Sequence, residues 1–249
     1  MFHLAGQPGL SATAPFELYL RNNVTATKRL LEALERSGTG AKLINIATSS
    51  VYGRDASGDE TSEPKPTSDY GVTKLAAEQI VLAKARDEHY PACSLRLFSV
   101  YGERERPEKL FPRLIHSILA GEPFPLYEGS CEHVRSYTYI GDIVDGLLAS
   151  LERFEAVRGE ILNIGTHRTM TTGEGIAVVE RLLGRKADID LKPRRKGDQL
   201  RTAADIGKAK RLLDYSPATL PEEGLAKEVA WYRDEVFGRI NPYREPVLC

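Results

Sequence analysis

Residues 42–53 read KLINIATSSVYG, and this stretch decides the fold class. Residues 42–47 form an apolar run about as long as a strand that is buried on both faces of a parallel sheet. The hydroxyl-bearing residues Thr48, Ser49 and Ser50 follow directly, at the end of a sheet strand where open α/β sheets bind their ligands. The stretch therefore predicts an α/β fold with a polar site at the carboxyl end of one strand.

Strand and helix patterns alternate on both sides of this stretch. Residues 2–5 are a short apolar strand, and residues 16–35 carry an apolar stripe of helical period. A second helical pattern covers residues 68–85, and a strand follows at 93–98. Alternation at this spacing predicts a parallel sheet with right-handed crossovers.

The pattern changes after residue 102, and the second half is expected to form a smaller lobe on the carboxyl edge of the sheet. A helix at 110–120 is followed by a hairpin-like stretch through 135–139. The remaining predicted elements are a strand at 160–164 and helices at 140–151, 172–183, 206–213 and 221–236.

Composition excludes several classes of protein. The chain has 249 residues, 34 Lys+Arg against 35 Asp+Glu and a net charge of −1, which argues against a nucleic-acid binder. No apolar run is long enough to cross a membrane, and the first residues do not resemble a signal peptide, so a cytoplasmic protein is expected. Three cysteines without a CxxC pair suggest neither a disulfide framework nor a metal site.

Tyr70 and Lys74 form the first candidate catalytic pair. Four residues apart on a helix, they share a face, so the ammonium can favour the phenolate and lower the pKa of the tyrosine. Such a tyrosine is a general acid and base for a sugar hydroxyl or keto group, and Thr48 could hydrogen-bond the same reacting oxygen. The plainer interpretations are a chance Tyr–Lys pair and hydroxyls that only cap the strand and turn.

Several further motifs join these in a fixed order. They are HLAGQ at 3–7, NNV at 22–24, TSSVYG at 48–53, YGVTK at 70–74, LRLFSVYG at 95–102, RSYTYIGD at 135–142 and RKGD at 195–198. Together they resemble the extended short-chain dehydrogenase/reductase family, the NAD-dependent sugar-nucleotide epimerases and dehydratases. The resemblance implies a Rossmann-like doubly wound parallel sheet formed by residues 1–105, with 134–166 returning to it. Residues 106–249 would form the mainly substrate-binding lobe.

The resemblance also assigns site residues. Tyr70 would be the acid and base, Lys74 its partner and a ribose ligand, and Thr48 the hydroxyl that shares the substrate oxygen. The resemblance further implies that NAD is bound by Ala5, Gly6, Gln7 and Asn23. It implies that a nucleotide-diphosphate sugar is bound by Ser49, Ser99, Arg135, Arg195 and Asp198. Guanidinium groups suit diphosphate oxygens, and a carboxylate suits ribose hydroxyls, although surface charges would look the same in a sequence.

Ser49 and Ser50 help to choose a reaction. Related 4,6-dehydratases resemble one another in placing an acidic pair after the threonine, so serines here favour C4 epimerisation through a 4-keto sugar. The loop Arg104-Glu105-Arg106-Pro107 is similar to a segment of UDP-glucuronate and UDP-glucose 4-epimerases and could meet a uronate carboxylate. A 4-keto-sugar reductase or dehydratase and a non-catalytic sugar-nucleotide-binding paralogue stay open as alternatives.

The sequence departs from the family at its start. A GxxGxxG turn that would cradle the pyrophosphate is absent, and residue 2 corresponds to roughly the fourth family strand, as if about 60–70 residues, two βα units, were missing. A late start, a truncated paralogue and a fragment would each explain this, and we expect the 249 residues alone to hold NAD weakly. NADP is not excluded, and the resemblance implies a homodimer built on residues 16–35 and 68–85.

Overall fold

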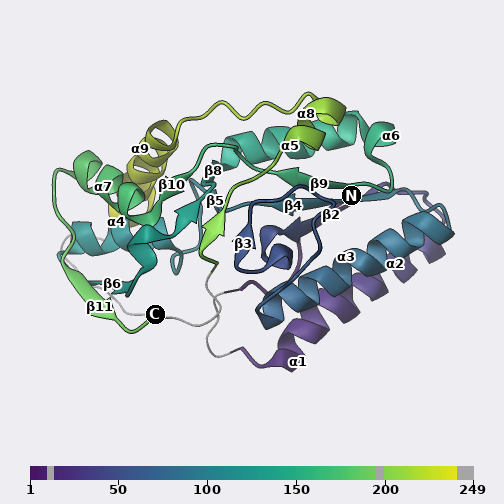
Figure 1. The fold of residues 1–249 in the computed structure, drawn as a ribbon, viewed down its shortest axis with the longest axis horizontal. Helices are drawn as coiled ribbons and strands as arrows, with labels where there is room; N and C mark the ends of the chain where they lie inside the picture. Colours follow the sequence, from purple (N-terminus) through teal and green to yellow (C-terminus); the bar gives the residue numbers. More distant parts are fainter. Residues whose placement is uncertain (10–13, 195–198, 240–249) are drawn as a thin grey trace.

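A four-stranded parallel sheet organises the protein in the computed structural model, which describes residues 1–9, 14–194 and 199–239 (Figure 1). Its strand order is β1 (Phe2–His3), β2 (Leu43–Thr48), β4 (Ala92–Leu97) and β9 (Ile161–Ile164). All three pairings are parallel, which confirms the predicted parallel α/β sheet. Every residue of β2 is buried, as its unbroken apolar run requires.

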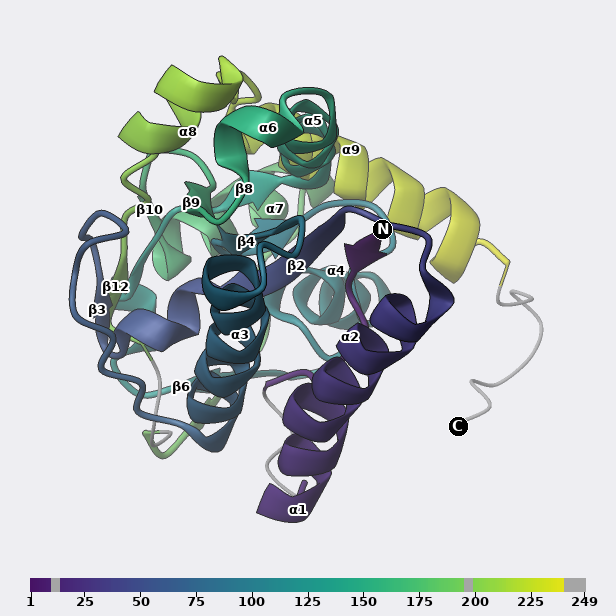
Figure 2. The same ribbon diagram turned by 90° about the vertical axis from the view of Figure 1, so that its right-hand side faces the viewer.

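Helices cover both faces of this sheet. On one face, α1 (Phe16–Tyr19) and α2 (Ala26–Ser37) are joined by a π-helical segment, Leu20–Thr25, into one long helix beside α3 (Asp69–Asp87) (Figures 1 and 2). The other face carries α5, α6 and α8, which are Ile140–Glu152, Phe154–Val157 and Gly207–Leu213 (Figure 1). The Ser68 hydroxyl caps α3 by accepting a hydrogen bond from the Gly71 N–H at 3.1 Å.

A second hydrophobic core lies among α4 (Leu110–Ala120), α7 (Thr172–Leu183) and α9 (Pro221–Trp231), away from the sheet (Figure 1). A π-helical segment, Tyr232–Phe237, continues α9. The division of the chain at residues 105 and 106 stays a prediction. Within the described residues, no helix is both long and apolar enough to cross a bilayer.

Short strands and turns connect the two cores. The strands are β3 (Asp55–Ala56), β5 (Val100–Tyr101), β6 (Phe124–Tyr127), β7 (Val134–Arg135), β8 (Thr138–Tyr139), β10 (Met170–Thr171), β11 (Ile189–Lys192) and β12 (Arg201–Thr202). Two 3₁₀ turns are Ser49–Tyr52 and Ser130–Glu132.

The hairpin-like stretch predicted through residues 135–139 is wrong. β6 pairs in parallel with β11 and β8 with β5, while β7 pairs with β10 and β12. Most of these partners lie dozens of residues away, so a local pattern of short apolar runs and turns could not reveal them.

Candidate active site

The turn after β2 is the centre of the candidate site. Thr48 and Ser49 are buried, and the Thr48 hydroxyl accepts a hydrogen bond from the Ser50 N–H at 3.2 Å, which starts the 3₁₀ turn. A Cβ on Gly71 would lie 2.8 Å from the Ser50 carbonyl oxygen. Glycine at this position therefore allows the first turn of α3 to approach the end of β2, which brings Tyr70 to Thr48.

Tyr70 is half-buried, and its hydroxyl lies close enough to the Thr48 side chain to interact with it. Burial raises the pKa of Tyr70 above its ordinary value, while the interaction with Thr48 and the positive charge of Arg106 oppose that rise. The sequence led us to expect a lowered pKa under the influence of Lys74. In the folded chain, desolvation outweighs the charges that favour the phenolate, and the opposing charge is that of Arg106.

Lys74 is directed toward the sheet. Its Nζ donates a hydrogen bond to the Ile46 carbonyl oxygen at 2.5 Å, and the side chain is buried. Burial lowers the pKa of Lys74 to about 8, although Glu78 acts in the opposite direction. The pKa of His3 is lowered as well, first by burial and then by the Lys74 charge. The ammonium group thus lies among β1, β2 and α3.

Gly6 and Gln7, two of the residues assigned to NAD, contact a third, Asn23. Its Oδ1 accepts a hydrogen bond from the Gln7 N–H at 2.7 Å, and its Nδ2 donates to the Thr73 hydroxyl at 3.0 Å. A Cβ on Gly6 would meet the same Oδ1 at 2.9 Å, so the turn at residues 5–7 is seated directly on Asn23. Asn23 lies in the π-helical segment, a local geometry that is frequent at functional sites.

Arg135 on β7 is connected through Gln199 to the turn that follows Thr48. Its guanidinium donates to the carbonyl oxygens of Val134 and Gln199. The Gln199 side chain in turn donates to the carbonyl oxygens of Gly53 at 2.9 Å and Ser49 at 3.3 Å. Gln199 therefore joins the arginine to the turn that follows Thr48.

The other residues assigned to the substrate are placed less fully. Ser99 is half-buried between β4 and β5, and its carbonyl oxygen accepts the Thr138 N–H at 3.0 Å. Arg195 and Asp198 lie outside the described residues.

Three residues near the site were not among the assigned site residues, although the loop that contains Arg106 had been considered for a uronate carboxylate. A Cβ on Gly9 would lie 3.1 Å from the Tyr70 ring, so the backbone of the N-terminal turn packs on that ring. Arg106 acts electrostatically on Tyr70 from a loop more than 30 residues away, and Gln199 forms the link just described. The basic loop around Arg106 was visible in the sequence, whereas Gly9 and Gln199 carried no signal.

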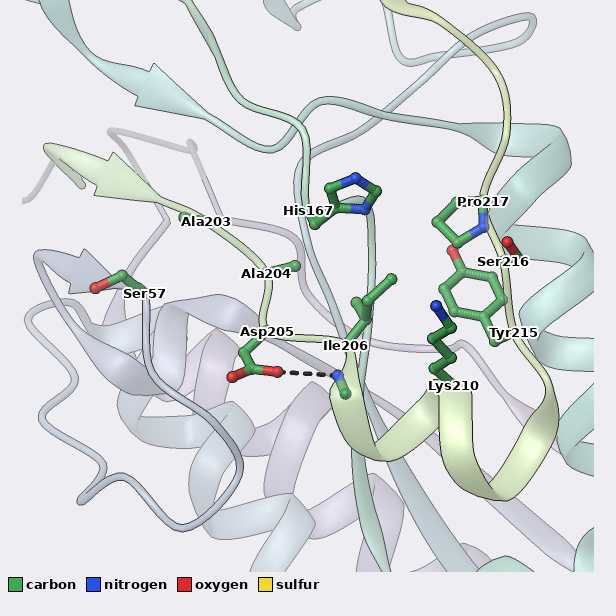
Figure 3. Close-up of a pocket in the computed structure, with 11 residues that line it drawn as sticks. Ser57, His167, Ala203, Ala204, Asp205, Ile206, Lys210, Tyr215, Ser216 and Pro217 are labelled. Atoms are coloured by element: carbon green, nitrogen blue, oxygen red, sulfur yellow. Dashed lines mark hydrogen bonds between the residues drawn. The ribbon is translucent and has the colours of Figure 1, made fainter.

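A cavity of about 520 Å³ lies elsewhere, between the segment after β12 and the start of α8 (Figure 3). It is bordered by His167, Lys210 and Tyr215, and the Asp205 carboxylate accepts a hydrogen bond from the Gly207 N–H at its edge. None of the described candidate residues lines this cavity. In the described part of the chain, no group of three or more His, Cys, Asp or Glu side chains could hold a metal ion.

Comparison with known proteins identifies the family. Residues 1–165 match the model of the NAD dependent epimerase/dehydratase family. A Bacillus subtilis (strain 168) protein described as an uncharacterized UDP-glucose epimerase is 37% identical over 93% of this chain and 73% of its own length. The UDP-glucuronate 4-epimerase of Thermodesulfobacterium geofontis is 32% identical over 95% of this chain and 73% of its own.

Solved structures agree. UDP-glucuronic acid 4-epimerase from Bacillus cereus, in complex with UDP-glucuronic acid and NAD, superimposes with a TM-score of 0.86 at 36% identity, over 93% of this chain and 74% of that one. The dTDP-glucose 4,6-dehydratase DesIV from Streptomyces venezuelae, with NAD bound, gives 0.88 at 29% identity, over 98% and 75%. These findings confirm the family resemblance, the Rossmann-like fold, the enzyme class and the cofactor NAD. The chain belongs to the NAD dependent epimerase/dehydratase family.

Proposed function

We propose that the protein epimerises C4 of a UDP-sugar of the UDP-glucose or UDP-glucuronate type through a 4-keto intermediate. The observation that carries this proposal is the placement of Tyr70 beside Thr48 at the end of β2, together with serines at positions 49 and 50. An elimination of water needs an extra acid and base, and serines at these positions supply neither.

The described residues fit the nicotinamide end of NAD. The turn at residues 5–7 contacts Asn23, Asn23 contacts Thr73 next to Lys74, and a Cβ on Gly6 or Gly9 would crowd Asn23 or the Tyr70 ring. Bound NAD would supply the acceptor, and then the donor, of the hydride that leaves and returns to C4 of the sugar. Tyr70 and Lys74 would hold the ribose, and Asn23 would keep the turn in place.

Tyr70 moves the proton in this scheme. Its phenolate takes the proton of the C4 hydroxyl as the sugar is oxidised, and the phenol returns it to the 4-keto oxygen on reduction. Thr48, beside the tyrosine, would hydrogen-bond the reacting oxygen. The charge of Arg106 favours the phenolate, which counters the burial that raises the pKa of Tyr70.

Substrate recognition is proposed for the basic residues. Arg135, joined through Gln199 to the Thr48 turn, is suited to a diphosphate, and Arg195 and Asp198 keep their assignments to phosphate and ribose. Ser99 would contact the sugar. Arg106 is exposed and close enough to influence Tyr70, so its guanidinium could receive the carboxylate of a uronate.

The decisive assay incubates the protein with NAD and UDP-glucuronate and follows UDP-galacturonate by NMR. We expect Tyr70→Phe to lower turnover by about 100-fold or more while UDP-glucuronate still binds. Tyr90→Phe is the matched control, because the Tyr90 hydroxyl donates to the Ala41 carbonyl oxygen at 3.0 Å, outside the site. Wild-type turnover in Tyr70→Phe would remove the assignment of Tyr70, and binding without turnover by the wild type would favour the non-catalytic paralogue.

A 4,6-dehydratase is the second candidate, because the DesIV structure superimposes as well as the epimerase does. The same assay with dTDP-glucose or UDP-glucose distinguishes the two. A 4-keto-6-deoxy product indicates the dehydratase, and the C4 epimer indicates the epimerase.

A homodimer built on α1, α2 and α3 is also proposed. Phe16, Leu20 and Val72 on this helical layer are each more than 40% exposed, which is apolar area that a partner could cover. Light scattering that gives twice the chain mass supports this interface if Val72→Glu converts the protein to a monomer. A monomeric wild type contradicts it.

A further inference from the structure

Glu228 and Glu105 lie close enough in the second core for their carboxyl groups to interact. Glu228 on α9 is fully buried, and Glu105, in the loop that follows β5, has a side chain that is 9% exposed. Both oxygens of Glu228 and the Oε2 of Glu105 are buried, and among the described residues no partner meets hydrogen-bond geometry with any of these three oxygens. Two neighbouring carboxylates would repel each other here, whereas one added proton makes a hydrogen bond between them.

Charges around the pair indicate which carboxyl group holds the proton. Burial raises the pKa of Glu105, but Lys109, whose Nζ lies 3.1 Å from the Oε1 of Glu105, opposes that rise and favours the carboxylate form. Glu228 has no such ion pair among the described residues, and burial followed by the charge of Glu105 raises its pKa to about 9. The Gly102 N–H acts in the opposite direction on Glu228. The other titratable groups that act on the pair are Tyr101, Glu103, Arg106 and Tyr137.

The loop that carries Glu105 is bent sharply. Gly102 has a φ of +131°, and a Cβ there would lie 2.6 Å from the Ile140 side chain, so only glycine fits. Arg104 has a φ of +67°, a left-handed conformation that costs energy for a residue with a side chain. A loop in this conformation needs contacts from outside itself to stay in place, and Glu228 is positioned to supply one.

We propose that Glu228 is a positioning residue whose carboxyl proton, shared with Glu105, holds the loop at residues 102–109 on α9 and thereby keeps Arg106 beside Tyr70. The Glu228 O–H donates to the Oε2 of Glu105, while Lys109 balances the remaining negative charge. The role of Arg106 in this inference rests on the proposed function, but the shared proton does not.

The proton makes the loop sensitive to pH. In the unfolded chain Glu228 loses its proton near its ordinary pKa of 4.5, whereas the folded chain keeps it to about 9. The folded state therefore binds more protons across this window, and its stability falls as pH rises. Where the difference amounts to one whole proton, the unfolding constant rises about tenfold per pH unit.

Two measurements test the shared proton without any catalytic assay. In urea unfolding between pH 6 and 9, Glu228→Gln should remove the fall in stability that the wild type shows, because its amide donates at every pH. Glu222→Gln is the matched control, since Glu222 lies on the same helix with 68% of its side chain exposed. The stability of Glu222→Gln should depend on pH as that of the wild type does. Parallel wild-type and Glu228→Gln profiles overturn the proposal.

Brief trypsin digestion under native conditions tests the position of the loop. Cleavage after Arg104, identified by mass spectrometry, should be slow in the wild type at pH 7 and at least tenfold faster in Glu228→Ala. Glu228→Gln should restore the slow rate at pH 7 and keep it at pH 9. Equal rates after Arg104 in all three proteins overturn the positioning role. Loss of sugar-nucleotide binding with these rates intact contradicts only the proposed function.

Discussion

Replacing Glu78 with glutamine should cost the protein much of its stability. Glu78 on α3 is fully buried and accepts hydrogen bonds from Arg96 Nε at 3.0 Å, Arg96 Nη2 at 2.6 Å and the Ser94 hydroxyl at 3.2 Å. The Arg96 side chain is 1% exposed and lies over the Tyr52 ring, 4.7 Å from its centre. The amide keeps one acceptor but leaves a guanidinium charge buried without its counter-charge. Breaking a buried pair in this way costs about 3–5 kcal/mol.

Urea unfolding at pH 7, followed by circular dichroism, measures this loss. The variant Glu155→Gln provides the control, because Glu155 pairs with Lys42 at 3.0 Å on the surface, where the two side chains are 70% and 43% exposed. Its unfolding midpoint should stay close to that of the wild type. The double variant Glu78→Leu with Arg96→Met should recover much of the lost stability, since no charge then stays buried. A loss below about 1 kcal/mol in Glu78→Gln would refute the reasoning, because a surface pair would account for it.

Three further predictions concern the candidate site. Burial lowers the pKa of Lys74 from 10.5 to about 8, so the unfolded state binds more protons than the folded state between these pH values. In urea unfolding, the stability of the wild type relative to Lys74→Met should therefore rise from pH 8 to 10.5. Parallel pH profiles of the two proteins would contradict the burial argument. Asn23→Ala should lose about 1–3 kcal/mol in the same assay at pH 7, because the part-buried Gln7 N–H loses its acceptor and the buried Thr73 hydroxyl loses the donor from Asn23. An unchanged midpoint would show that these bonds contribute little. Gly9→Val should push the Tyr70 ring from its place, which near-ultraviolet circular dichroism detects as a changed aromatic signal while the far-ultraviolet spectrum stays the same.

Much of the sheet and its helices could be predicted from the sequence because their patterns are local. The apolar run of β2, the helical stripe that became α1 to α2 and the helix at α3 each depend on neighbours a few residues apart. The pairings of β6, β7 and β8 could not be predicted, since their partners come from distant parts of the chain.

The candidate site divides in the same way. Thr48 and Tyr70 were recognisable because a parallel strand and the following helix bring their ends together, and the ordered motifs pointed to the family. The helical spacing of Tyr70 and Lys74 predicted a shared face but not the direction of the ammonium group, which reaches the Ile46 carbonyl.

By itself, the sequence determined the class of sheet, the family and the residue types at the end of β2, because periodicity and motif order survive without coordinates. Only the tertiary structure decided which charges and hydrogen bonds these groups meet. Arg106 beside Tyr70, Gln199 between Arg135 and the Thr48 turn, and Glu228 against Glu105 each join residues tens to more than a hundred positions apart. The pKa of a side chain depends on burial and on such neighbours, and these exist only once the chain has folded.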